Sequence, residues 1–227
     1  MYSVKSPLRL LALVLTLSLA TTLNGCSPSI DQLIKQGADA QKIKNYSQAE
    51  AIYRKIIQRE PNNAKAYYNL GIVLSDQGKL EEAIAAYRQA IQLDPKFATV
   101  YYNLGIALRQ QGKLEEAIAA YRQALKLPDN IDPPASTHAL SRNGIGLVLQ
   151  QQGNLEQAIE EYKKSLQIDP NYPIASNNLQ EAERLLTLRR NPQSVEAMDD
   201  RQYLPKNEPA VAILRSVVLI KADFSST

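Results

Sequence analysis

Apolar and small residues recur through residues 30–172 with the three- and four-residue spacing of amphipathic helices. Glycine, asparagine or proline interrupts this pattern at intervals, as expected for helix ends and the turns between helices. A series of glycines inside the helical stretches has spacings of 34, 34 and 41 residues: Gly37, Gly71, Gly105 and Gly146. A period of this length predicts a stack of helix–turn–helix units instead of one irregular core.

The two central units are nearly identical. Residues 67–72 and 101–106 both read Tyr-Tyr-Asn-Leu-Gly-Ile, and residues 79–90 and 113–124 both read Lys-Leu-Glu-Glu-Ala-Ile-Ala-Ala-Tyr-Arg-Gln-Ala. This pattern resembles the tetratricopeptide repeat, a 34-residue pair of helices. The resemblance implies an all-α superhelix of about four repeats with a capping helix. A polar linker and one strand-like segment would follow it.

The expected domain organisation follows from this register. Four repeats occupy residues 30–172, and the flanking copies are weaker, with Gln36 where leucine is expected and Arg142 in place of an aromatic residue. An amphipathic helix caps the stack, because the end of a solenoid needs a polar outer face. The boundaries are 30–63, 64–97, 98–131 with an insertion to 138, and 139–172 for the repeats, 173–190 for the cap, 191–210 for the linker and 211–227 for the tail.

Glycine has two expected roles in these units. A glycine inside a helix costs about 1 kcal/mol, so we expect Gly71 and its equivalents where a second helix backbone approaches closely, with Ala83 as the small partner. Gly78 and its equivalents fall between two helical patterns and are predicted to end the first helix in a left-handed conformation. In the first repeat we expect Asn45 to take this second role.

The N-terminus has the pattern of an export signal. Lys5 and Arg9 precede an apolar stretch at 10–23, which is too short to span a membrane. The following Leu-Asn-Gly-Cys resembles a bacterial lipobox, although Asn24 departs from the usual small residue. The resemblance implies a signal peptide at 1–25, lipidation of Cys26 and a tether at 26–29. The protein would then be a lipoprotein of the cell envelope, with the outer membrane favoured because Ser27 is not Asp. The alternative is an ordinary signal peptide that is cut elsewhere.

The charge and the reactive residues argue against several functions. Without residues 1–25 the chain has 24 basic and 23 acidic residues, which are interleaved, so a nucleic-acid partner is not expected. One Cys and one His cannot build a structural zinc site, and no glycine-rich phosphate loop follows a strand. We therefore predict no catalytic residue, no metal and no small-molecule cofactor. His138 is expected to be a solvated surface residue.

A binding groove is implied by the family resemblance. In tetratricopeptide arrays the first helix of each repeat lines a concave surface that takes peptides or protein segments, so the chain is predicted to be an interaction scaffold. Ile72 and Ile106 stand where a clamp for chaperone tails needs asparagine, which argues against that ligand. Asn69 and Asn103 could also be common repeat residues without a binding role. The predicted groove residues are Tyr68, Asn69, Ile72, Tyr102, Asn103, Ile106, Arg109 and Asn143.

The C-terminal tail does not fit the repeat pattern. Residues 211–220 are rich in β-branched residues and predict a buried strand. This stretch is similar to the opening strand of a trypsin-like protease domain. The alternative function is therefore a regulatory or targeting part of such a protease, whose catalytic domain is truncated or split off. A disordered or self-pairing tail is the third reading.

Overall fold

The computed structural model describes residues 27–129 and 136–191, and its regular elements in these ranges are all α-helices. None of these helices is long and apolar enough to cross a bilayer. The predicted signal peptide, Cys26, the predicted linker after Asn191 and the predicted strand-like tail lie outside the described residues. The helices are α2 (Ile30–Lys42), α3 (Tyr46–Arg59), α4 (Ala64–Asp76), α5 (Leu80–Leu93), α6 (Ala98–Gln110), α7 (Leu114–Ala124), α8 (Thr137–Gln151), α9 (Leu155–Ile168) and α10 (Pro173–Arg190).

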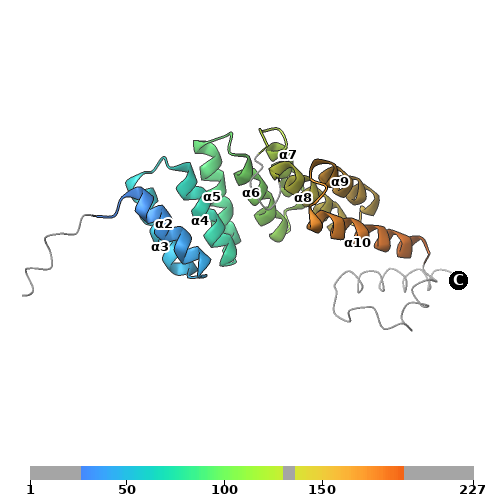
Figure 1. Cartoon of the computed structure of the whole chain (residues 1–227), viewed down its shortest axis with the longest axis horizontal. Coiled ribbons are helices and arrows are strands. Elements are labelled where there is room, and N and C mark those ends of the chain that lie inside the picture. Colours follow the sequence, from blue (N-terminus) through green and yellow to red (C-terminus); the bar gives the residue numbers. More distant parts are fainter. Residues whose placement is uncertain (1–26, 130–135, 192–227) are drawn as a thin grey trace, which may run out of the picture.

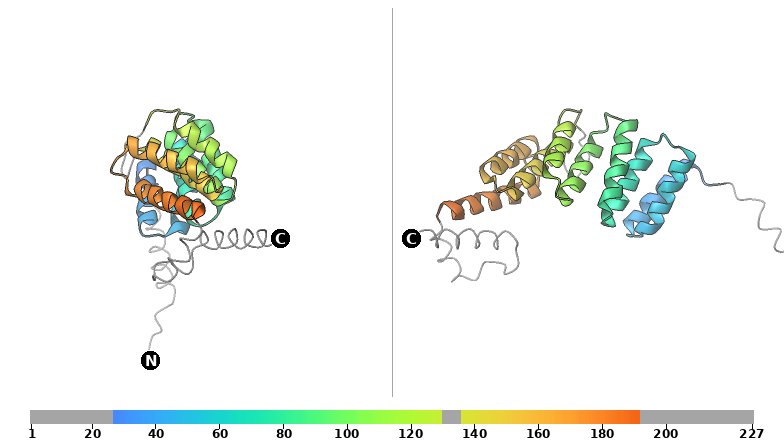
Figure 2. Two further views of the ribbon diagram at one scale, coloured as in Figure 1. Left: turned by 90° about the vertical axis from the view of Figure 1, so that its right-hand side faces the viewer. Right: turned by 180° about the vertical axis from the view of Figure 1, so that it is seen from behind.

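These helices pack in consecutive pairs. α2 pairs with α3, α4 with α5, α6 with α7 and α8 with α9, and α10 packs on α9 as the last layer. The pairs stand beside one another in one elongated row from α2 to α10 (Figures 1 and 2). The predicted all-α array of paired helices is therefore confirmed.

A buried tyrosine on each second helix forms the centre of each pair. Tyr53, Tyr87, Tyr121 and Tyr162 are at most 2% exposed. One helical turn earlier each second helix has a fully buried alanine, which lets the first helix pack closely: Ala49, Ala83, Ala117 and Ala158. The sequence period thus reappears as a column of tyrosines along the core.

The glycines inside the first helices make room for these tyrosine rings. A Cβ added at Gly71 would lie 2.5 Å from Cε1 of Tyr87, and one at Gly105 would lie 2.5 Å from Cε1 of Tyr121. Real Cβ atoms do not approach other atoms this closely. Our expectation that a helix backbone excludes the side chain was wrong, since the ring that lies one turn beyond Ala83 fills the space.

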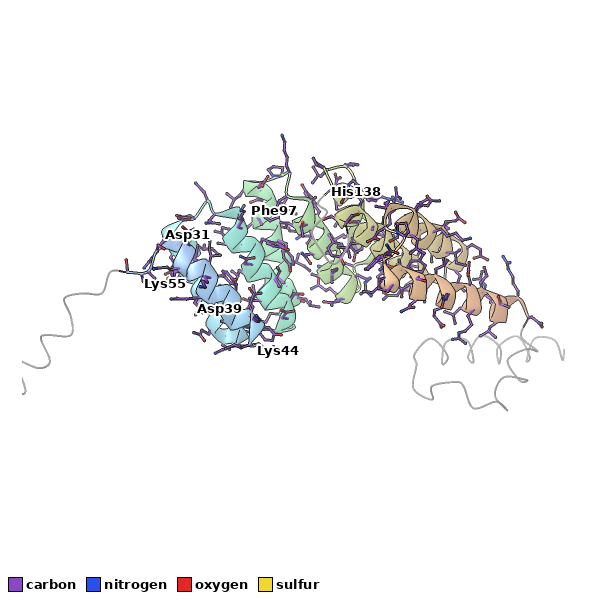
Figure 3. All side chains as sticks on the ribbon, in the orientation of Figure 1. Asp31, Asp39, Lys44, Lys55, Phe97 and His138 are labelled. Carbon is purple, nitrogen blue, oxygen red and sulfur yellow. The ribbon has the colours of Figure 1, made fainter. Side chains whose placement is uncertain are left out.

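The turns inside the pairs depend on one residue with positive φ. Gly78, Gly112 and Gly153 have φ between 75° and 80°, as predicted for a left-handed helix end. In the first pair Lys44 takes this conformation, with φ 58° (Figure 3). The prediction of Asn45 was wrong, because its side chain instead caps the start of α3 by accepting from the Gln48 N–H at 3.3 Å.

Replacing Lys44 with glycine should stabilise the protein. A left-handed conformation costs an L-residue about 1 kcal/mol, and glycine adopts it without that strain. We expect Lys44→Gly to raise the free energy of unfolding by about 0.5–1 kcal/mol in urea titrations. Lys35→Gly is the matched control, because this exposed position lies inside α2, where glycine should cost about 1 kcal/mol. An unchanged or lower stability of Lys44→Gly would contradict the argument.

His138 anchors the start of α8 to the preceding chain. Its ring Nε2 lies 2.8 Å from the carbonyl oxygen of Leu127, and its backbone N–H donates to Asp129 Oδ1 at 3.0 Å. Since a carbonyl oxygen only accepts, Nε2 carries the hydrogen in this contact. The side chain is half-buried, so the expectation of a solvated surface residue was wrong.

Candidate functional site

The first helices of successive pairs touch one another along the array. α4 contacts α6, α6 contacts α8 and α8 contacts α10, whereas α5, α7 and α9 make no comparable contacts with each other. Helices on the inner side of a curved stack lie closer together than those on the outer side. This arrangement makes the first helices one continuous face, which is where the predicted groove residues lie.

Tyr68 and Asn103 form a rung between the second and third pairs. Asn103 Nδ2 donates to the hydroxyl oxygen of Tyr68 at 3.1 Å and also to the backbone oxygen of Thr99 at 3.1 Å. The Tyr68 ring packs against Phe97 and Tyr87, with centroids 4.9 and 6.4 Å away. Both side chains of the rung are half-buried. They therefore hold the repeats together, and only part of their surface is open to a partner.

Tyr102, Ile106 and Arg109 follow one another on α6 at spacings of four and three residues, which places them on one side of the helix. All three are half-buried. The Tyr102 ring lies 5.9 Å from the Tyr121 ring between centroids, and burial raises the pKa of its hydroxyl. This tyrosine is thus uncharged and half inserted between the helices.

Asn69 and Ile72 on α4 are also half-buried. Asn103 donates a hydrogen bond to Tyr68, which lies 35 residues earlier in the chain. The residue 35 positions before Asn69 is Ile34, whose side chain has no hydrogen-bonding group. The two asparagines are therefore not equivalent. The Asn103 amide is used inside the protein, while the Asn69 amide lacks that partner.

Asn143 does not lie open on this face. It is 5% exposed, and its Oδ1 accepts from Asn178 Nδ2 on α10 at 2.9 Å. The pair again joins residues 35 positions apart, so it repeats the Tyr68–Asn103 rung two junctions later, between the fourth pair and α10. Our sequence reasoning missed Asn178, although the 35-residue spacing could have indicated it. The structure thus gives Asn143 a role in packing the capping helix and contradicts its prediction as an open groove residue.

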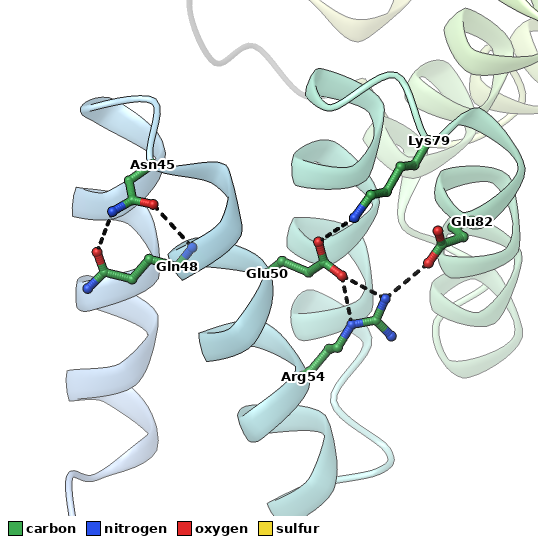
Figure 4. A network of polar contacts seen from close by, with 6 residues as sticks. All are labelled: Asn45, Gln48, Glu50, Arg54, Lys79 and Glu82. Carbon is green, nitrogen blue, oxygen red and sulfur yellow. Dashed lines mark hydrogen bonds and ion pairs between the residues drawn. The ribbon is translucent and has the colours of Figure 1, made fainter.

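The surface of the second helices is linked by ion pairs between repeats. Arg54 on α3 contacts Glu82 on α5 at 3.0 Å, and Arg88 on α5 contacts Glu116 on α7 at the same distance. Arg54 also holds Glu50, which Lys79 contacts from the other side (Figure 4). Exposed pairs of this kind contribute little stability, but they leave fewer unpaired charges for a partner on this surface.

Glu50 stands where the later repeats have Ile84, Ile118 and Ile159. The hydrogen bond from Lys79 Nζ, at 2.9 Å, and that from Arg54 lower the pKa of the Glu50 carboxyl to about 2, against the opposing effect of burial. The side chain is only 16% exposed. The first two repeats are therefore joined by a charged contact where the others use an apolar one.

This lowered pKa predicts an acid-dependent loss of stability. A carboxyl whose pKa falls from 4.5 in the unfolded chain to about 2 in the folded chain stabilises the fold fully above pH 4.5. That contribution is lost as the pH falls through about 2. We expect the stability difference between the wild type and Glu50→Gln to be constant above pH 5 and to shrink towards pH 2 in urea titrations. A difference that does not change between pH 5 and pH 2 would contradict the assignment.

The arrangement provides a continuous surface for binding. Within residues 27–129 and 136–191, no three His, Cys, Asp or Glu side chains are placed to hold a metal ion. Stacked helix pairs whose first helices form one face define a helical-repeat scaffold.

Comparison with known families agrees with this class. Residues 73–111 match the family described as TPR repeat, and residues 102–173 and 52–85 match two described as tetratricopeptide repeat. Together these matches span residues 52–173, more than half of the chain. The chain therefore belongs to the tetratricopeptide repeat family. No curated protein sequence matches it.

Solved structures with the same fold include three informative neighbours. Pseudomonas aeruginosa PilF is 26% identical with a TM-score of 0.61, over 75% of this chain and 72% of its own. MamA is 27% identical with a TM-score of 0.58, over 68% and 86%. The Cut9–Hcn1 structure is 24% identical with a TM-score of 0.59, over 68% and 30%, and supports the fold alone. Partner binding is thus the function that the fold implies.

Proposed function

We propose that this chain is a lipid-anchored scaffold of the bacterial cell envelope that binds a peptide or protein segment along its first helices. It acts by binding and not by catalysis. The observation that carries the proposal is the contact between successive first helices, from α4 to α10. That contact gives an extended segment one continuous surface to follow.

The composition of this face suits a protein ligand. Half-buried Asn69, Ile72 and Ile106 combine an amide with apolar surface, which is the mixture found in protein interfaces. The second-helix surface is less suitable because its charged groups already pair between repeats. Tyr68 and Tyr102 would contribute through their exposed edges while they also support the packing.

Crosslinking in cells tests which face binds. A photoreactive phenylalanine derivative placed at Asn69 or Ile106 should give discrete protein adducts in the bacterial host. The same probe at Ala85 or Ala119 should not, since these exposed alanines lie on α5 and α7. The two sets come from the same two repeats and are thus matched. Adducts from the second set alone would assign binding to the opposite surface.

The anchor is tested separately at Cys26. Two or three acyl chains attach a protein stably to a membrane. Cys26→Ser should therefore remain at precursor length and take up no clickable palmitate. The wild type should be labelled and shortened. Palmitate labelling that survives in Cys26→Ser would exclude this residue as the attachment site.

A further inference from the structure

Arg109 is the charged member of the first-helix face at a place where the other repeats have none. The equivalent residues are Gln41, Ser75 and Gln150. The Nε of Arg109 is fully buried and has no hydrogen-bond partner. No acid in the part of the chain that the structure describes forms an ion pair with it. A half-buried guanidinium without a carboxylate partner is unusual, because burying a charge is costly.

The repeat register shows what the arginine replaces. Tyr53 donates its hydroxyl to Gln41 Oε1 at 2.7 Å, and Tyr162 donates to Gln150 Oε1 at 2.8 Å. In the third repeat the acceptor is missing, because a guanidinium has only donors. The hydroxyl of Tyr121 instead has the guanidinium of Arg109 as its hydrogen-bond neighbour.

The tyrosines near Arg109 are uncharged. Burial raises the pKa of Tyr121 to about 12, although the adjacent guanidinium of Arg109 lowers it in part. Burial also raises the pKa of Tyr102, whose ring lies 5.9 Å from that of Tyr121. The guanidinium of Arg109 therefore lies beside uncharged tyrosines and has no carboxylate partner among the described residues.

We propose that Arg109 binds the side-chain carboxylate of an Asp or Glu in the segment that occupies this face. The inference rests on the proposed function, because the ligand is part of the bound segment. Guanidinium and carboxylate form paired, charge-assisted hydrogen bonds. A side chain is favoured over a chain terminus because the face continues past α6 in both directions, over α4 and over α8.

Replacing Arg109 with glutamine separates binding from stability. Glutamine restores the acceptor that the first and last repeats use, and it removes the buried unpartnered Nε. Arg109→Gln should therefore melt at the same temperature as the wild type or higher, but it should no longer bind the carboxylate. A residue with a purely structural role would instead lower the melting temperature on replacement.

The experiment follows the Arg109 Nε–H signal by NMR in the full chain in detergent micelles, assigned by its absence from Arg109→Gln. N-acetylglutamate N-methylamide should shift this signal, and the shift should saturate. The dissociation constant at Arg109 should be at least tenfold lower than that at Arg122, which is exposed on α7. N-acetylglutamine N-methylamide is the neutral control, and N-acetylalanine presents a terminal carboxylate. A shift that rises linearly with ligand concentration, as at Arg122, would overturn the proposal. Preference for N-acetylalanine would overturn the assignment to a side chain.

Selection from a library of ten-residue peptides distinguishes this inference from the proposed function. Both ends of each peptide are fused to a carrier, so that no free chain terminus is presented. The wild type should enrich peptides with Asp or Glu, and Arg109→Gln should lose that enrichment. If both proteins enrich the same peptides without acids, the role of Arg109 is rejected and peptide binding stands. If neither enriches any peptide, the proposed function is contradicted, while the NMR titration still decides whether Arg109 binds carboxylates.

Discussion

Gly71→Leu should destabilise the protein by about 1–3 kcal/mol or more, because overpacking a close helix contact forces rings or backbone to shift. Even the first atom of the new side chain would lie 2.5 Å from the Tyr87 ring. That ring is 2% exposed and is part of the packed core, so moving it disturbs its neighbours. The higher helix propensity of leucine, about 1 kcal/mol better than glycine, offsets only part of the cost. Urea titration followed by circular dichroism measures the change.

Two further variants test the cause. Ala85→Leu adds three carbons at an exposed position on α5 and should change the stability by less than about 0.5 kcal/mol. Tyr87→Ala removes the ring, so adding Gly71→Leu to it should cost much less than adding Gly71→Leu to the wild type. Equal costs in both backgrounds would show that the helix backbone, and not the ring, excludes a side chain at Gly71.

Much of the fold follows from spacing alone. The 34-residue interval between Gly71 and Gly105 places equivalent residues at equivalent positions, and a stack of helix pairs is the simplest structure with that property. The physical reason for each glycine did not follow, because both a ring and a backbone exclude a Cβ. Only the 2.5 Å distance to Tyr87 separates the two explanations.

The left-handed turn of the first repeat shows a second limit. Asparagine tolerates positive φ better than lysine does, so composition favoured Asn45. The repeat spacing favoured Lys44, which lies 34 residues before Gly78. In the structure Lys44 is the residue with positive φ. In a repeat protein the packing against neighbouring units fixes the backbone conformation. It therefore outweighs the conformational preference of a single residue, which is about 1 kcal/mol.

The candidate face was predicted in position but not in detail. The residues expected on the first helices are there, yet sequence could not show which amides pair inside the protein. Asn103 and Asn143 do so through bonds to Tyr68 and Asn178, which come from neighbouring repeats. Such pairing depends on a 35-residue offset between first helices, which becomes visible only when the helices are placed side by side.

Tyr121→Ala should cost about 3–5 kcal/mol and should separate the array into two unfolding units. The ring of Tyr121 fills the space beside two glycines, Gly105 on α6 and Gly144 on α8, where an added Cβ would lie 2.5 and 2.7 Å from it. Because neither glycine has a side chain that could fill the cavity, both the third pair and its junction with the fourth lose their packing. In a linear array each repeat is stabilised by its neighbours only, so a weakened junction lets the two sides unfold separately.

Urea unfolding of Tyr121→Ala followed by circular dichroism should therefore show two transitions, whereas we expect one for the wild type. Hydrogen exchange should assign them to α2–α6 and to α8–α10. Tyr162→Ala is the matched control: it removes an equally buried ring next to Gly146, but in the last pair, where only α10 follows. It should lower stability by a similar amount and keep a single transition. A single transition in both variants would mean that other contacts between α7 and α8 couple the two halves, and that Tyr121 does not determine the cooperativity of the array.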